Sequence, residues 1–112
     1  INSVVICSFL VYKIPPTYIV ELLNSITGWD MSFDEFMITG ERIFNLRRMI
    51  NVRRGISRKD DTLPPRILTH KLEGGTMGNL PFLGLMLNEY YAHRGWSEEG
   101  IPTKEKLAKL GL

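Results

Sequence analysis

The stretch SFDEFMITGERIFNLRRMINVRRG, residues 32–55, decides the fold class of this chain. It opens with Ser32 and Glu35, a capping box in which each side chain accepts the backbone amide of the other residue. Gly55 stands where a helix would end, and Gly40 inside the stretch indicates close approach of another backbone. The stretch predicts one long amphipathic helix. Its apolar stripe comprises Phe36, Ile43, Phe44, Leu46, Met49 and Ile50, and arginines fill the opposite side: Arg42, Arg47, Arg48, Arg53 and Arg54.

The flanking segments also carry helical periodicity and helix end signals. We expect helices over residues 17–28, 81–95 and 103–111, each ending at or next to a glycine. Thr17 and Thr103 are the expected caps at two of the helix starts, because a threonine hydroxyl can accept a backbone amide there. Convincing β alternation appears nowhere in the sequence.

The first residues, 1–12, are apolar from the start and carry no initiating Met. The run stops at Lys13 and Pro15, well short of the roughly 20 apolar residues that a membrane span requires, and it has no basic leader region. We therefore expect a buried helix, an interior segment whose upstream part is missing, and no membrane partner. The sequence as a whole predicts an all-α fold of about five helices in which residues 1–112 form a single helical domain.

Residues 57–81 read as one long irregular loop, interrupted by three prolines and three glycines. Loops of this length in a compact domain are usually functional or held by a neighbouring domain. Within it, the run RKDDTLP at residues 58–64 places two bases and two acids before a proline. These charges either orient a ligand or cap a turn, and the structural role is favoured.

Composition and charge narrow the class of protein. The 112 residues are 44% hydrophobic and 23% charged, which excludes a disordered or collagen-like chain. The net charge is +2, yet residues 41–71 carry nine bases against three acids, a local charge of +6. Such a basic middle suits phosphates or an acidic protein partner. The single cysteine, Cys7, forms no internal disulfide and favours an intracellular, cytoplasmic location.

Taken alone, the residues carry no catalytic motif. Cys7 reads as a small buried hydrophobe, and Glu89 with His93 lacks the second histidine of a zinc helix. The aromatic residues Trp29, Tyr90, Tyr91 and Trp96 read as core or interface anchors. The basic Arg42–Arg54 face leaves open a stand-alone helical binding module, although the absence of interleaved aromatics and of a helix-turn-helix spacing argues against nucleic acid.

Several blocks of sequence, in order, resemble the C-terminal region of the tungsten-dependent aldehyde ferredoxin oxidoreductase family. The similarity covers nearly the whole chain, and collinear blocks are more specific than any single motif. The blocks are TGWD (27–30), GERIFNLRR (40–48), NVRRG (51–55), RKDDTLP (58–64), LNEYY (87–91), RGW (94–96), GIPTKEKL (100–107) and LGL (110–112).

The resemblance implies the C-terminal helical domain of a larger enzyme. Members of that family oxidise aldehydes to carboxylic acids at a tungsten ion, or molybdenum in some relatives, held by two pterin cofactors. They pass electrons through a [4Fe–4S] cluster to ferredoxin. The implied partners are the missing N-terminal domains, ferredoxin and an aldehyde substrate, and the fragment alone is expected to be inactive. In this setting the basic helix would face an acidic surface elsewhere in the enzyme or on ferredoxin.

The resemblance also implies site residues. Three cluster cysteines of the family come from a C-x2-C-x3-C group that is absent here, and the fourth lies in an Asp-x-x-Gly-Leu-Cys pattern. In this sequence the pattern aligns Asn2 with the aspartate, Val5 with the glycine, Ile6 with the leucine and Cys7 with the cysteine. Cys7 is thereby the candidate metal ligand, and Asn2 is a candidate cofactor contact near the pterin. No catalytic residue is expected in this chain.

Overall fold

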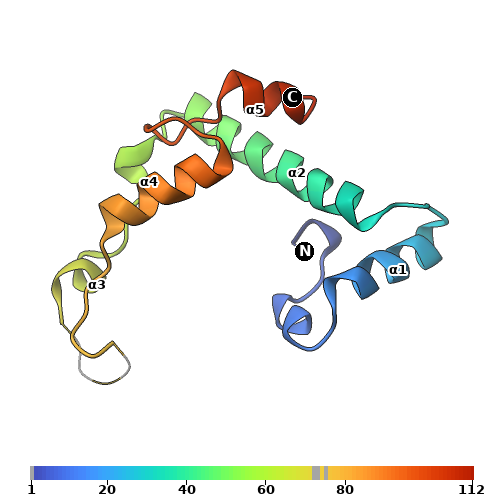
Figure 1. Cartoon of the computed structure of the whole chain (residues 1–112), viewed down its shortest axis with the longest axis horizontal. Coiled ribbons are helices and arrows are strands. Elements are labelled where there is room, and N and C mark those ends of the chain that lie inside the picture. Colours follow the sequence, from blue (N-terminus) through green and yellow to red (C-terminus); the bar gives the residue numbers. More distant parts are fainter. Residues whose placement is uncertain (1, 72–73, 75) are drawn as a thin grey trace. The chain divides into compact units, whose positions relative to one another are not determined.

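The chain is all-α in the computed structural model, which describes residues 2–71, 74 and 76–112, without the side chains of Asn2 and Val11. This confirms the predicted fold class. Within the described residues the β pairing amounts to one isolated bridge, between Trp96 and Pro102. The elements follow one another (Figure 1) as 3-10 helices η1 (Asn2–Val4) and η2 (Ser8–Tyr12), helices α1 (Pro16–Thr27) and α2 (Phe33–Arg53), 3-10 helix η3 (Arg58–Asp60), and helices α3 (Pro65–Thr69), α4 (Leu83–Arg94) and α5 (Lys104–Lys109).

The chain divides into two compact units, residues 1–44 and residues 45–112. Helix α2 begins in the first unit and continues in the second. The single domain over residues 1–112 stays a prediction.

In the first unit, α1 starts on two consecutive prolines. Pro15 occupies the N-cap position and makes no side-chain cap, and Pro16 is the first helical residue. The predicted cap at Thr17 is therefore wrong, because the fixed φ of proline already starts the helix and places Thr17 inside its first turn. Gly28 ends α1 as predicted, with φ +72°, and its amide donates to the Asn24 carbonyl over 2.8 Å.

The turn between α1 and α2 is held by side chains. The Asn24 amide donates to the Met31 carbonyl over 2.9 Å, and its oxygen accepts the Met31 amide over 3.1 Å. The predicted capping box is confirmed: the Ser32 amide donates to Glu35 over 2.8 Å, and the Glu35 amide donates to the Ser32 hydroxyl over 3.2 Å. The hydrogen bonds that the Ser32 amide and hydroxyl donate to the Glu35 carboxylate lower the pKa of Glu35. Local sequence thus sets where α2 begins.

The buried helix predicted for residues 1–12 is wrong. Two separate 3-10 turns, η1 and η2, stand in its place, and most of the described side chains of this segment are exposed. The run Val4-Val5-Ile6 is β-branched, which disfavours a helix, and Val5 takes φ +56°, which interrupts one. The segment therefore presents its apolar side chains at the surface of the first unit, with Val5, Phe9 and Tyr12 at 76% exposure or more.

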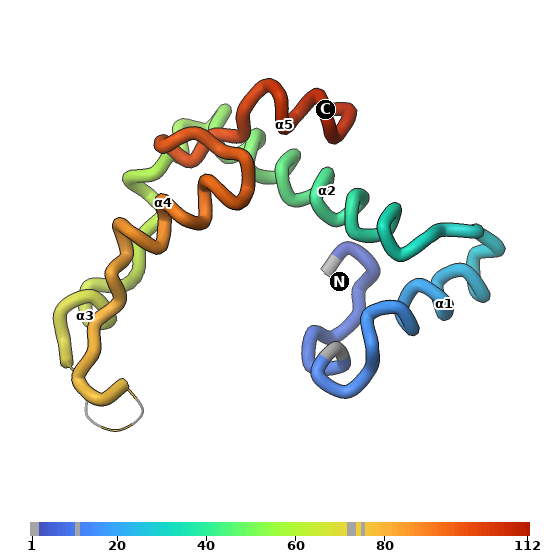
Figure 2. Tube along the Cα trace, viewed as in Figure 1, coloured from blue at the N-terminus to red at the C-terminus, as the bar shows by residue number. Residues whose placement is uncertain are grey.

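In the second unit, the chain after α4 folds back across the end of α2 (Figure 2). Helix α4 ends at Gly95, which has φ +67°, and the following turn is closed by the Ser97 amide donating to the Ile101 carbonyl over 2.8 Å. Thr103 then caps α5 as predicted, its hydroxyl accepting the Lys106 amide over 3.2 Å. Tyr91, Trp96, Pro102 and Leu110 are the buried apolar residues of this unit.

The predicted loop over residues 57–81 contains more order than expected. The 3-10 helix η3 has its own capping box, in which the Ser57 amide donates to Asp60 over 2.9 Å, and α3 starts on Pro65. The signals were present in the sequence, since Ser57 with Asp60 and Pro64 with Pro65 are local helix starts. Elements of three and five residues carry too little periodicity to be recognised.

The faces of α2 also differ from the prediction. Its buried positions in the second unit are Asn45 and Arg48, whereas Leu46 and Ile50 are 49% and 44% exposed. This polar face is buried because its side chains form hydrogen bonds with residues from other parts of the second unit. The expected close approach at Gly40 is not observed among the described residues, since a Cβ atom built there would have no neighbour within 4 Å.

Candidate functional site

A partly buried ion pair joins α2 to the segment that follows η3. Arg48 is 9% exposed and donates two parallel hydrogen bonds to the carboxylate of Asp61, over 2.8 Å and 2.5 Å. Its third nitrogen, Nε, donates to the Gly100 carbonyl over 2.7 Å. Bidentate pairing of this kind combines charge with fixed geometry. Arg48 therefore links three stretches of chain that are far apart in sequence.

Two aromatic residues complete this cluster. The Tyr91 hydroxyl donates to the same Asp61 oxygen, Oδ2, and the indole of Trp96 donates to Asn45 over 2.8 Å. The Arg48 guanidinium lies 5.1 Å from the centre of the Trp96 ring. Among the described residues no buried side-chain nitrogen or oxygen lacks a hydrogen-bond partner. We call Asn45, Arg48, Asp61, Tyr91 and Trp96 the buried polar cluster.

The electrostatics of the cluster favour one charge state. Burial by itself raises the pKa of Asp61, but the hydrogen bonds from Arg48 and Tyr91 outweigh it and the pKa falls below its ordinary value. Burial, together with the hydrogen bond to the Asp61 carboxylate, raises the pKa of Tyr91 to about 12. The hydrogen bond to Asp61 also raises the pKa of Arg48. At neutral pH the cluster is thus an ionised Arg–Asp pair with a neutral tyrosine.

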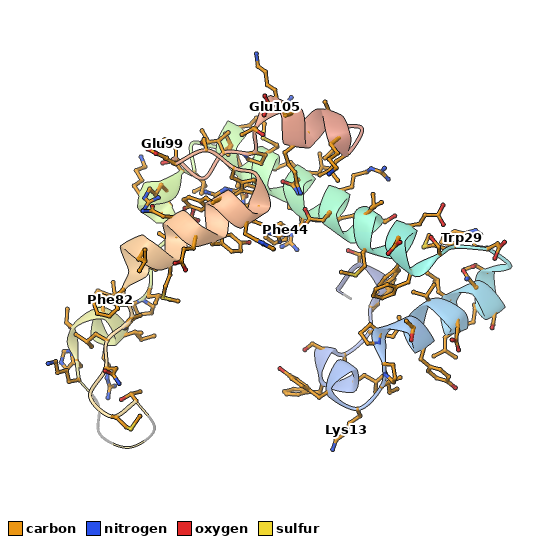
Figure 3. The ribbon with its side chains drawn as sticks, viewed as in Figure 1. Lys13, Trp29, Phe44, Phe82, Glu99 and Glu105 are labelled. Atoms are coloured by element: carbon orange, nitrogen blue, oxygen red, sulfur yellow. The ribbon has the colours of Figure 1, made fainter. Side chains whose placement is uncertain are left out.

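A pocket of about 500 Å³ opens beside the cluster in the second unit. Glu99, one of its lining residues, lies on the turn between α4 and α5 (Figure 3). Arg58 crosses it, donating to the carbonyls of Glu98 and Gly84 over 3.0 Å and 3.2 Å. Its guanidinium lies 5.4 Å from the centre of the Tyr91 ring. The lining residues are Arg58, Asn88, Tyr91, Ala92, Trp96, Glu98 and Glu99. Tyr91 and Arg58 already donate to protein groups, so these two side chains are not poised for proton transfer to a molecule in the pocket.

The charged run at residues 58–64 has the structural role that was favoured. Asp60 accepts a backbone amide, and Asp61 pairs with Arg48. Sequence reasoning found these acids but missed their partners. The Arg48–Asp61 and Trp96–Asn45 contacts span 13 and 51 residues. No short-range sequence pattern predicts contacts between residues so far apart in the chain.

The residues predicted as a metal and cofactor site lie in the first unit. Cys7 is a free, exposed thiol directly before η2. Asn2 lies in η1, and its side chain lies outside the described part of the structure. Glu89 and His93 are both exposed on α4. In the part of the chain that the structure describes, no three His, Cys, Asp or Glu side chains gather as a metal site.

Comparison with known proteins places the chain in a family. The family model described as aldehyde ferredoxin oxidoreductase, domains 2 and 3, matches residues 1–112. The chain belongs to the aldehyde ferredoxin oxidoreductase family. The resemblance seen in the sequence is thereby confirmed, and the chain is similar to a part of oxidoreductases.

Individual members of the aldehyde ferredoxin oxidoreductase family are similar over the whole chain. The tungsten-containing aldehyde ferredoxin oxidoreductases of Pyrococcus horikoshii and Pyrococcus furiosus are each 39% identical over 114 aligned residues, which cover 100% of this chain and 19% of the relative. An aliphatic sulfonate oxidoreductase, WOR-like subunit, of Pyrococcus furiosus is 32% identical over 120 residues, covering 99% of this chain and 19% of that protein. The chain thus spans about a fifth of the length of these relatives.

Among the described residues, no helix is both long enough and apolar enough to cross a membrane.

Proposed function

We propose that this chain is the C-terminal part of an enzyme that oxidises aldehydes to carboxylic acids with ferredoxin as electron acceptor. In this proposal Cys7 supplies one thiolate to a [4Fe–4S] cluster and Asn2 lies near a tungsten, or molybdenum, bis-pterin. The observation that carries the proposal is the free, exposed thiol of Cys7. This thiol lies in a segment that resembles the cluster-binding pattern of the family. The relative named as an aliphatic sulfonate oxidoreductase makes sulfonates the second candidate substrate class.

The backbone at Val5 supports the alignment of that segment. Val5 takes φ +56°, a left-handed conformation that glycine adopts readily and β-branched residues rarely adopt. In the family pattern this position is glycine. A glycine-like backbone in the absence of glycine indicates that the turn before Cys7 is required by the fold of the segment. The turn places the thiol at the surface of its unit, where ligands from another segment can reach it.

The donor chemistry of this segment fits a shared cluster. A [4Fe–4S] cluster requires four thiolates, and the chain has one cysteine, so three ligands would come from elsewhere in the enzyme. When bound, the cluster supplies one-electron transfer between the pterin-bound metal and ferredoxin. The Cys7 thiol would lose its proton on binding iron, and the apolar neighbours Val5, Ile6 and Phe9 would exclude water from the sulfur.

The proposed partners follow from this division of ligands. They are the remaining domains of the same enzyme, which make up about four fifths of the length of the relatives, together with ferredoxin and an aldehyde. We place the enzyme in the cytoplasm, where thiols stay reduced. The chain by itself lacks three cluster ligands and is proposed to be inactive.

The test replaces Cys7 in the complete enzyme. Cys7→Ala should lower the iron content, abolish the paramagnetic signal of the reduced cluster and remove aldehyde-dependent reduction of a viologen dye. Ser8→Ala is the matched control, because it changes the next exposed residue and leaves the thiol in place. An unchanged cluster signal in the Cys7→Ala enzyme would refute the proposed ligand. Aldehyde oxidation by the purified 112-residue chain alone would refute the proposal that the chain needs the remaining domains for activity.

A further inference from the structure

The outward side of α2 in the second unit combines apolar and basic residues. Leu46 and Ile50 lie one helical turn apart and are 49% and 44% exposed. Arg47 lies on the Ile50 side of this pair, and Arg54, the residue directly after the end of α2, follows it seven residues later. Arg53, the last residue of α2, lies seven residues after Leu46, on the other side of the pair. All three arginines are exposed. We call Leu46, Arg47, Ile50, Arg53 and Arg54 the outer α2 surface.

The structure separates these arginines from Arg48. Arg48 is buried in the polar cluster and neutralised by Asp61. Arg47, Arg53 and Arg54 have no carboxylate within ion-pairing distance among the described residues. The sequence-based hypothesis of a continuous arginine face is therefore replaced by two arginine flanks with an apolar centre. A protein interface of this composition has a dehydrated middle and a charged rim.

We propose that the outer α2 surface docks onto an apolar patch with an acidic rim that belongs to the remaining part of the same enzyme. The proposal shares one premise with the proposed function, namely that the 112 residues are one part of a longer enzyme. The apolar centre distinguishes this surface from a phosphate-binding one, where a continuous positive stripe would serve better. Acidic groups are required opposite, because the three guanidinium groups that border the contact have no carboxylate partner among the described residues.

The same features argue against the other occupants. In a symmetric dimer centred on Ile50, the two-fold axis would bring the arginines of one copy against those of the other, and the like charges would repel. A separate acidic protein, such as a ferredoxin, would leave Leu46 and Ile50 in water whenever it dissociates. Permanent interfaces are the more apolar ones, so an apolar centre favours a permanent neighbour.

The decisive experiment is zero-length cross-linking of the complete enzyme. Arg47→Lys and Arg54→Lys retain the charge and introduce primary amines, which a carbodiimide joins to carboxylates in direct contact. We expect cross-links from the introduced lysines to acidic residues outside residues 1–112 of the same polypeptide. Lys109, exposed on α5, is the internal control for general reactivity. A mixture of isotopically light and heavy enzyme separates links within one copy from links between copies.

A second measurement needs no substitution. Hydroxyl-radical footprinting of the native enzyme should oxidise Leu46 and Ile50 at least tenfold more slowly than in the enzyme unfolded by urea. Reactivity of both side chains near that of the unfolded state would overturn the proposal. Cross-links between copies, cross-links only to added ferredoxin, or no cross-link at all would also overturn it. The [4Fe–4S] cluster content and the aldehyde oxidation of the same variants test the proposed function, whereas the cross-links and the footprinting test the docking surface.

Discussion

Gly100 packs directly against the buried polar cluster and forms a hydrogen bond with it. Its carbonyl accepts Arg48 Nε, and its backbone has φ +72°. A Cβ atom at this position would lie 2.5 Å from Arg48 Nη2 and 2.8 Å from Tyr91 Cζ. The turn after α4 therefore requires glycine for two independent reasons, conformation and space.

Replacement of Gly100 should test both reasons. Gly100→Ala is expected to lower the free energy of unfolding of the chain by about 3 kcal/mol, the sum of the left-handed penalty and the cost of overpacking. Gly111→Ala is the matched control, because Gly111 has φ +68° and open space around its Cα. It should cost only about 1 kcal/mol. Urea unfolding followed by tryptophan fluorescence measures both, and equal losses would contradict the predicted steric conflict.

Tyr91 gives the second prediction at this scale. Its pKa in the folded protein is about 12, against 10.0 for a free tyrosine. A folded pKa above the unfolded one means that stability is retained below pH 10 and is lost as the pH rises toward 12. In an absorbance titration at about 295 nm, one of the four tyrosines should ionise last, and Tyr91→Phe should remove that step. Ionisation of all four near pH 10 would contradict the buried hydrogen bond to Asp61.

The elements show which parts of the fold are readable from sequence. The start of α2 was predicted because Ser32 and Glu35 are three residues apart, and the end of α1 because Gly28 follows it directly. The buried side of α2 was mispredicted, because hydrophobicity alone assigns Leu46 to the core and Arg48 to the surface. Asn45 and Arg48 are buried by partners 51 and 13 residues away, which no local pattern reveals. Cys7 stays a proposed ligand, and only the resemblance to a family singles it out.

Thr103 tests how one cap holds an element in place. Its hydroxyl accepts the Lys106 amide over 3.2 Å and donates to the Gly95 carbonyl over 3.1 Å, so it joins the start of α5 to the end of α4. Thr103→Ala should cost about 1–2 kcal/mol in urea unfolding. Thr103→Ser keeps the hydroxyl and should cost well under half as much. Similar losses in both variants would assign the effect to the lost methyl group.

At the scale of the whole molecule, few apolar residues are buried. The buried apolar side chains among the described residues are Ile19, Val20, Tyr91, Trp96, Pro102 and Leu110, while many large ones are exposed on both units. Phe82, which projects from the start of α4, is 80% exposed (Figure 3). Exposed apolar surface on this scale is characteristic of a protein part that is covered in its complete form.

The isolated chain should therefore bind a hydrophobic dye. We expect the fluorescence of anilinonaphthalene sulfonate to rise several-fold with the 112-residue chain and to stay low, per mole, with the complete enzyme. Leu46→Asp combined with Ile50→Asp should reduce the dye signal of the chain, because these side chains form an apolar pair on the outer α2 surface. A complete enzyme that binds as much dye as the chain would show that these surfaces remain uncovered.

The separation in sequence between Arg48 and Gly100 also sets the order of events during synthesis. The two residues are 52 positions apart, and translation at about 5–20 residues per second delivers Gly100 roughly 3–10 s after Arg48. Helix α2 can form during that interval. The Arg48 guanidinium and the Asn45 side chain must stay hydrated, however, until the turn after α4 emerges from the ribosome. The core of the second unit is consequently completed late. In a nascent chain stalled before Trp96, Asn45 and Arg48 lack Trp96 and Gly100, two of the partners that bury them.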